Sequence, residues 1–181
     1  MPRETLEFAS AVSNDTSTDA SKLGAIDDDV MLFQTVGHEA VIEIDDLAGS
    51  VGTINWVRHK VVFRGVSVAG KATVTVKVFI TDGSGTEYYN ETHDAAAAMR
   101  TEDGTERTTT DGSTAWTESD INGIRLKVEY EAESTTNDMM VDYVALVVDY
   151  DEAPPETYDA TVKNAHFTSG NVYLKSGNVY I

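Results

Sequence analysis

The stretch Thr73-Val-Thr-Val-Lys-Val-Phe-Ile80 carries the clearest strand pattern in the chain. Its alternation places four apolar residues on one face, namely Val74, Val76, Val78 and Ile80, and Thr73, Thr75, Lys77 and Phe79 on the other. A period of two is the side-chain repeat of a β-strand, so this stretch predicts a strand with one buried face. The turn residues Asp82-Gly-Ser-Gly85 follow it and predict a tight reversal of the chain.

Further strand patterns extend from this stretch in both directions. Runs rich in β-branched and aromatic residues occupy 30–34, 40–44, 53–57, 61–68, 86–90, 124–130 and 139–150. Between Met139 and Tyr150 both alternating faces are almost entirely apolar, which predicts a central strand covered on both sides. The polar stretch 92–114 predicts a long hairpin or an exposed loop. About eight strands with short turns predict an all-β fold, an antiparallel, jelly-roll-like β-sandwich.

Composition divides the chain into four parts. Residues 1–28 are polar and have no apolar face, which predicts an extended N-terminal arm held by another subunit. The β-sandwich is expected over 29–152. Two adjacent prolines then predict a stiff, extended linker over 153–157, because proline cannot continue a central strand. A C-terminal β-repeat tail is expected over 158–181.

The tail repeats itself every seven residues. Asparagine recurs at Asn164, Asn171 and Asn178, and Val-Tyr pairs place tyrosines at Tyr173 and Tyr180. Each unit is a short strand followed by Ser-Gly-Asn, residues that favour tight turns. Strands this short need a neighbour, so the tail is expected to add strands to other chains in an assembly. The alternative is a small terminal meander that packs on its own domain.

The chain is strongly acidic. It holds 31 acidic and 13 basic residues, for a formal charge of −18. A surface this negative repels phosphates and anionic lipids, so we expect binding neither to nucleic acid nor to a membrane. Scarce lysine and abundant threonine are typical of halophilic proteins, in which molar salt shortens the Debye length to about 3 Å. An acidic protein from ordinary salt is the alternative interpretation.

Other global features limit the function classes. Cysteine is absent, which excludes disulfides and thiolate chemistry. No secretory signal is apparent at the start of the sequence, and the apolar runs fall short of the ~20 residues of a membrane-spanning helix.

Candidate catalytic histidines are few. His38, His59, His93 and His166 lack the i, i+4 helical spacing of a zinc protease, and surface loops or strand edges are the expected positions. The sequence has no Gly-x-Ser-x-Gly nucleophile elbow. We therefore expect a protein that is not an enzyme, with no catalytic residues and no organic cofactor.

One acidic run could bind a structural ion. Asp27, Asp28 and Asp29 could contribute oxygens to a calcium or magnesium ion, although the run lacks the spacing of a dedicated calcium loop. A solvated acidic run with no metal is the expected outcome.

Aromatic residues could form a platform for sugars. Trp56 lies within an apolar alternation and is expected in the core. Tyr88 and Tyr89 are the pair expected on the surface, where they could stack on a host glycan.

Two segments carry a resemblance to a known class. Trp116-Thr-Glu-Ser-Asp-Ile-Asn-Gly-Ile-Arg-Leu126, followed by Val141-Asp-Tyr-Val-Ala-Leu-Val-Val148, resembles virion structural proteins of tailed viruses. In this resemblance Trp116 would plug one end of the sandwich, and Asp120 and Asn122 would shape the turn before a strand. Together with the acidic composition, it implies a tailed virus that infects haloarchaea.

The resemblance implies a structural function in the virion. The expected protein is a capsid-associated decoration, vertex turret or fibre subunit, on the exterior of the head. It would form a trimer or pentamer, contact other virion proteins such as the major capsid protein, and assemble in the host cytoplasm. The alternatives are a neck or tail subunit, or a carbohydrate-binding module for host attachment.

Overall fold

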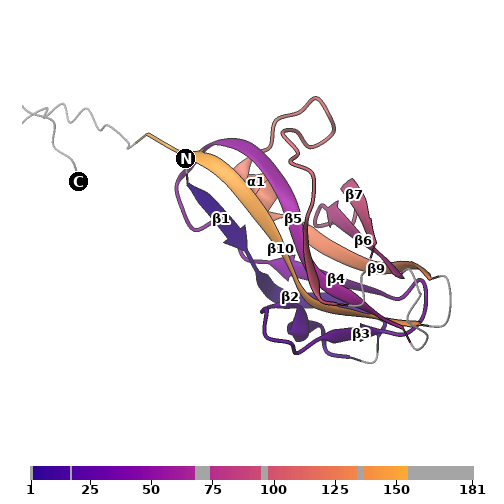
Figure 1. The fold of residues 1–181 in the computed structure, drawn as a ribbon. Coiled ribbons are helices and arrows are strands. Elements are labelled where there is room, and N and C mark those ends of the chain that lie inside the picture. Colours follow the sequence, from indigo (N-terminus) through magenta and orange to yellow (C-terminus); the bar gives the residue numbers. More distant parts are fainter. Residues whose placement is uncertain (1, 17, 68–73, 95–97, 134–136, 155–181) are drawn as a thin grey trace, which may run out of the picture.

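In the part of the chain that the structure describes, ten strands form two five-stranded antiparallel sheets that face each other. The computed structural model describes residues 2–16, 18–67, 74–94, 98–133 and 137–154 (Figure 1). The first sheet contains β1 (Arg3–Leu6), β3 (Met31–Phe33), β5 (Val51–Ser67), β8 (Arg100–Asp103) and β10 (Asn137–Glu152). The second contains β2 (Phe8–Asn14), β4 (Glu39–Ile44), β6 (Val74–Thr81), β7 (Glu87–Asp94) and β9 (Arg125–Glu133). The predicted all-β sandwich is therefore confirmed.

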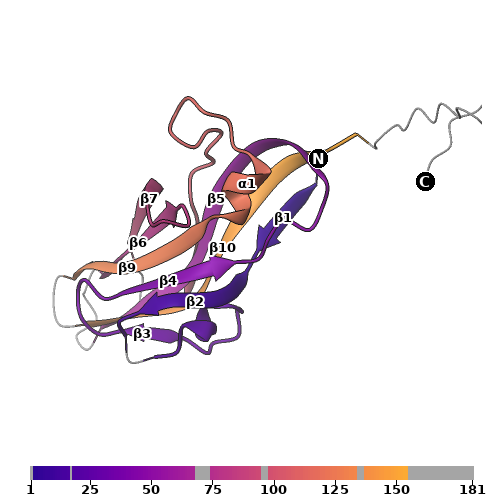
Figure 2. The same ribbon diagram turned by 180° about the vertical axis from the view of Figure 1, so that it is seen from behind.

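The second sheet follows the order β2-β4-β9-β6-β7, and it lies in front of β5 and β10 in Figure 2. Its apolar face contributes Val76, Val78 and Ile80 of β6 to the core, as their alternation predicts. β7 lies at the edge of this sheet, where β6 is its hydrogen-bonded neighbour.

The first sheet is built around the long pair β5–β10. These two strands run antiparallel from Asn137 opposite Ser67 to Glu152 opposite Val51. Every residue from Val141 to Tyr150 is buried, so β10 is covered on both sides as predicted. Tyr143 and Ala145 form a second small cluster with Val62, separate from the main core between the sheets.

The prediction of an N-terminal arm over 1–28 is wrong for the residues that the structure describes. β1 pairs with β10 and β2 pairs with β4, so this segment contributes one strand to each sheet. Leu6 is buried in the core, and a short 3-10 helix, η1 (Ala20–Leu23), buries Leu23 as well. Backbone hydrogen bonds to neighbouring strands hold this polar segment. Such bonds do not depend on the hydropathy of the side chains, so the sequence pattern did not predict them.

Trp56 is also placed differently from its predicted core position. It is half-buried, and the guanidinium groups of Arg3 and Arg58 lie 4.8 and 5.2 Å from its ring centre. The β5–β10 register shifts where Trp56 faces Asp149 and Ile54 faces Tyr150. This bulge interrupts the alternation, so Ile54 and Val57 are buried while Trp56 turns outward.

β10 ends at Glu152, and the N–H of Ala153 donates a hydrogen bond to the Ser50 carbonyl at 3.0 Å. The remainder of the predicted linker and the predicted tail over 158–181 lie outside the described residues. Asn164, Asn171, Asn178, Tyr173 and Tyr180 are therefore not placed. None of the described helices is long and apolar enough to cross a membrane.

Candidate functional site

Three side chains that could bind a metal ion meet between the two sheets. His59 lies on β5, while Glu91 and His93 lie two residues apart on β7 and so project from the same face of that strand. One ligand atom from each residue falls within 4.8 Å of the others. Of the residues that the structure describes, no other three acidic, histidine or cysteine side chains meet this closely.

The two histidines are in direct contact. His59 Nε2 lies 2.7 Å from His93 Nε2, so one imidazole donates a hydrogen bond to the other. Their ring centres are 5.0 Å apart in an edge-on arrangement. His59 is only 3% exposed and β5 is an interior strand, so the predicted surface or edge position is wrong for this residue.

The connection after β8 closes over this cluster. The N–H of Gly104 donates to the His59 carbonyl at 2.9 Å. A Cβ atom at position 104 would lie 2.4 Å from His59 Cε1, so only glycine fits against the imidazole. Thr105 donates from its backbone N–H and its hydroxyl to the two carboxylate oxygens of Glu91, each at 2.8 Å.

The surroundings shift the protonation of all three groups. Burial and the neighbouring His93 lower the pKa of His59 to about 4. Burial also lowers the pKa of His93. Burial alone would raise the pKa of Glu91, but the Thr105 hydrogen bonds and the nearby histidines together hold that pKa below its usual range. At neutral pH the cluster therefore offers neutral imidazoles and a charged carboxylate.

The predicted tyrosine platform is instead part of the packing beside this cluster. Tyr88 and Tyr89 are half-buried, and Tyr88 packs edge-to-face on Trp116 with ring centres 5.2 Å apart. The guanidinium of Arg107 lies 4.6 Å from the ring centre of Tyr89. The expectation of an exposed aromatic pair is therefore wrong.

Trp116 lies in the main core and is 4% exposed. Its indole N–H donates to the carbonyl of Arg107 at 2.9 Å, which links the start of the segment 116–126 to the connection after β8. The residues that the virion resemblance singles out thus begin at a buried aromatic group.

The rest of that segment forms a short helix, α1 (Glu118–Asn122). Thr117 and Asp120 form a capping box, in which each side chain accepts a hydrogen bond from the other residue's backbone N–H. Asn122 Oδ1 accepts from the N–H of Leu47 at 3.0 Å, and this bond ties α1 to the connection after β4. The contacts of Asp120 and Asn122 in the described structure are therefore structural.

The acidic run Asp27–Asp29 is exposed. Asp29 forms an ion pair with Lys22, and Asp27 Oδ1 accepts from the N–H of Asp29 at 3.0 Å. Asp142 of β10 lies near this loop, and burial raises its pKa although the backbone N–H groups of Asp27 and Asp28 oppose the shift. The run and Asp142 do not form a close cluster of ligand atoms.

Sequence reasoning did not identify Glu91 or link His59 with His93. Glu91-Thr-His93 places two ligand types on one face of a strand, and that spacing is a usable signal. His59 lies more than thirty positions earlier on another sheet, so only the fold brings it to the pair. His38 is half-buried elsewhere, and His166 lies outside the described residues.

No protein-family model matches this chain, and no curated protein matches it. Several solved structures are similar to this chain at low identity. The chain is similar to a truncated AlyQ with CBM32 and alginate lyase domains, at 14% identity and a TM-score of 0.40, over 86% of this chain and 36% of that one. It is similar to a structure of the Gt strain of infectious bursal disease virus, at 11% identity and a TM-score of 0.41, over 82% of this chain and 32% of that one.

The chain is also similar to a CBM4 structure, at 14% identity and a TM-score of 0.37, over 79% of this chain and 97% of that one. The chain thus spans about a third of the length of the first two structures. A virus structure and structures with CBM domains both appear among these neighbours. At TM-scores of 0.41 or lower, these similarities assign no function to this chain.

Proposed function

We propose that the chain is a non-enzymatic structural subunit of a virus particle, which assembles with other copies through its C-terminal repeats. The observation that supports this proposal is that the described residues before the repeats already form two paired sheets around a shared core. The main core draws on residues from Leu6 to Tyr150, and both sheets are formed by strands that end at or before Glu152. In this proposal the seven-residue repeats serve contacts with neighbouring copies.

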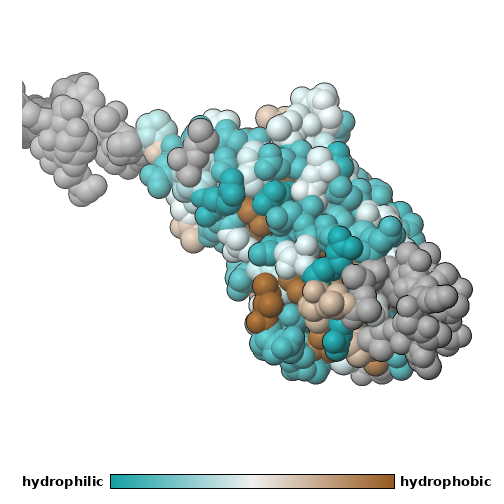
Figure 3. Space-filling view, viewed as in Figure 1, coloured by the Kyte–Doolittle hydropathy of each residue, from teal (hydrophilic) through white to brown (hydrophobic). Residues whose placement is uncertain are grey.

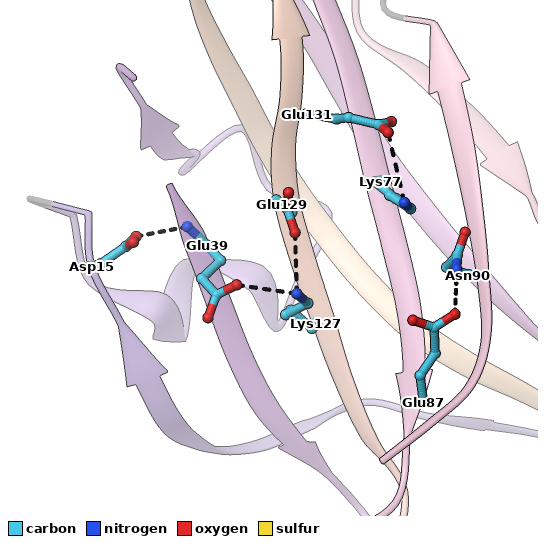
Figure 4. A network of polar contacts seen from close by, with 8 residues as sticks. All are labelled: Asp15, Glu39, Lys77, Glu87, Asn90, Lys127, Glu129 and Glu131. Carbon is cyan, nitrogen blue, oxygen red and sulfur yellow. Dashed lines mark hydrogen bonds and ion pairs between the residues drawn. The ribbon is translucent and has the colours of Figure 1, made fainter. Parts of the chain in front are cut away.

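The outer face of the second sheet supports the same proposal, because its paired charged side chains suit contact with solvent. Lys127 lies 3.1 Å from both Glu39 and Glu129, and Lys77 lies 3.6 Å from Glu131 (Figure 4). Both lysines also cover the ring of Phe79, and the Lys127 ammonium lies 3.9 Å from the ring centre. A face of paired charges offers little apolar area for a partner.

The visible surface in the view of Figure 3 is mostly hydrophilic, with separate small apolar spots. Among the described residues, the exposed large hydrophobic side chains are those of Val12 on β2, Ile26 in the connection before β3 and Val36 in the connection after β3. With a formal charge of −18, such a surface suits the screening of a high-salt environment. This favours a virus of a halophilic host, with the sandwich on the particle exterior and the tail at a shared axis.

The position in the particle is part of the proposal. A decoration, turret or fibre subunit on the head is preferred, and a neck or tail subunit shares the same physical requirements. Host attachment through a glycan is less well supported, because Tyr88 and Tyr89 pack against neighbours.

The test is the mass in solution of two forms of the protein. Light scattering in about 2 M potassium chloride compares the full chain with a truncation that ends at Pro154. We expect a discrete trimer or pentamer for the full chain and a monomer for the truncation. Circular dichroism of the truncation provides the control, since a folded β spectrum excludes loss of the domain itself.

Two outcomes would contradict the proposal. A full chain that stays monomeric, alone and with preassembled shells of a haloarchaeal tailed virus, would remove the assembly function. Specific glycan binding by the monomer, lost in Tyr88→Ala, would replace it with host attachment.

A further inference from the structure

We infer that His59, Glu91 and His93 bind one divalent transition-metal ion of the zinc class, which joins the two sheets at their edge. The ligands come from an interior strand of one sheet and the edge strand of the other. A bound ion would therefore act as a cross-link between the sheets. This inference is independent of the proposed virion function.

The ligand types select the metal. Two imidazoles and one carboxylate suit zinc and its neighbours in the first transition row, whereas calcium and magnesium prefer oxygen ligands alone. The acidic surface of this protein attracts any divalent cation through its net charge. Selectivity for zinc over magnesium is therefore the property that distinguishes a built site from that general attraction.

The contacts that would hold the metal ligands in position are already in place. Thr105 holds both oxygens of Glu91, and Gly104 packs against the ring of His59. Partners of this kind orient metal ligands, and their loss typically weakens binding by about 10- to 100-fold. Three protein ligands leave a fourth tetrahedral position for water, and the partial exposure of Glu91 and His93 gives that water access.

The distance between the two histidine nitrogens requires a small adjustment on binding. Zinc–nitrogen bonds of about 2.05 Å at a tetrahedral angle separate the two nitrogens by roughly 3.3 Å. The Nε2 atoms lie 2.7 Å apart in the hydrogen-bonded pair. His93 belongs to an edge strand with one hydrogen-bonded neighbour, so a displacement of its ring by about half an ångström can open the site.

The experiment uses the full chain without a histidine tag, stripped with a chelator and returned to molar potassium chloride. Titration calorimetry with zinc chloride in the presence of excess magnesium measures stoichiometry and affinity. We expect one zinc ion per chain. At a hundredfold excess of zinc over its dissociation constant, the melting temperature should rise by about 5–10 °C. Cobalt in place of zinc should give the visible absorption of a tetrahedral site.

The variants His93→Gln and Glu91→Gln remove one ligand each from half-buried positions, and both keep the buried His59 and Gly104 against its ring. We expect each variant to lose the cobalt absorption and to weaken zinc binding at least tenfold. His38→Gln is the matched control, because it removes a half-buried histidine outside the cluster. Zinc binding that survives both variants, or no selectivity over magnesium, would overturn the inference and leave a hydrogen-bonded histidine pair.

Discussion

Two regions of this molecule carry ligands of the kind that bind metal ions, and they differ in how the chain brings those ligands together. Asp27–Asp29 are adjacent in the sequence but exposed, and each carboxylate serves local contacts or solvent. His59, Glu91 and His93 are distant in the sequence but converge within 4.8 Å between two sheets. Adjacency along the chain raises the local charge, whereas convergence through the fold creates a site with fixed geometry.

The largest expected effect concerns the packing over the converged cluster. Gly104→Ala places a methyl group 2.4 Å from His59 Cε1 and 2.5 Å from its Nδ1. We expect the free energy of unfolding to fall by about 1–3 kcal/mol, as in other overpacked sites, with loss of zinc binding. Denaturant unfolding measures the first effect and calorimetry the second.

Gly83→Ala is the control for this substitution. Its added methyl group would meet the Gly123 carbonyl at 3.5 Å, an ordinary contact, so we expect a change below about 0.5 kcal/mol. Equal stability of the two variants would show that the connection after β8 can move away from His59. The converged cluster would then lack the fixed geometry that distinguishes it from the acidic run Asp27–Asp29.

A smaller effect is expected from Thr105→Val, which removes the hydroxyl that donates to Glu91 and keeps the backbone N–H bond. We expect zinc affinity to fall about tenfold, with little change in the stability of the metal-free protein. Thr108→Val, an exposed change on the same connection, is the matched control. Unchanged affinity in Thr105→Val would mean that Glu91 needs no such orientation.

Asp142 lies near the acidic run Asp27–Asp29, and its substitution should raise the stability of the protein rather than lower it. Burial raises the pKa of this carboxyl in the folded state, so folding favours its protonated form and stability rises as pH falls through the folded pKa. At neutral pH Asp142→Asn should therefore stabilise the protein, by about 1 kcal/mol or 2–4 °C in melting temperature. The difference from the wild-type chain should shrink as the solution is acidified.

Asp138→Asn removes the same charge from the same strand at a half-buried position. It separates the effect of burial at Asp142 from the general relief of a formal charge of −18. If both variants gain stability equally, net charge rather than burial explains the gain.

The sequence predicted the parts of the fold that depend on alternation. β6 and β10 follow from periodicity, because the burial of one face or of both faces appears directly in the side-chain pattern. β1 and β2 did not follow, because backbone hydrogen bonds to β10 and β4 anchor a segment with few apolar residues. Trp56 was misplaced because a bulge at Ile54–Trp56 breaks the period of two.

The candidate site is harder to predict from the sequence than the strands are, because it depends on the tertiary structure. The Glu91–His93 spacing is visible in the sequence, but their opposition to His59 requires knowing that β7 lies across from β5. The packing of Gly104 on His59 depends on the course of the connection after β8, which no local pattern encodes. From the sequence we therefore named only the adjacent aspartates as metal candidates, with no bound metal as the expected outcome, and did not identify the convergent cluster.

The smallest expected effect comes from the adjacent aspartates themselves. Asp29→Asn breaks the ion pair with Lys22, and the Asp29 side chain is 63% exposed. Exposed pairs of this type contribute about 0–1 kcal/mol, and less at high salt, so we expect a loss below about 0.5 kcal/mol in molar potassium chloride. Calcium at millimolar concentration should shift the melting temperature of this variant and of the wild-type chain equally. If calcium stabilised the wild-type chain but not Asp29→Asn, the acidic run would bind calcium specifically, contrary to our expectation. General attraction of calcium to the surface charge could not explain such a difference, because it is nearly the same in both proteins.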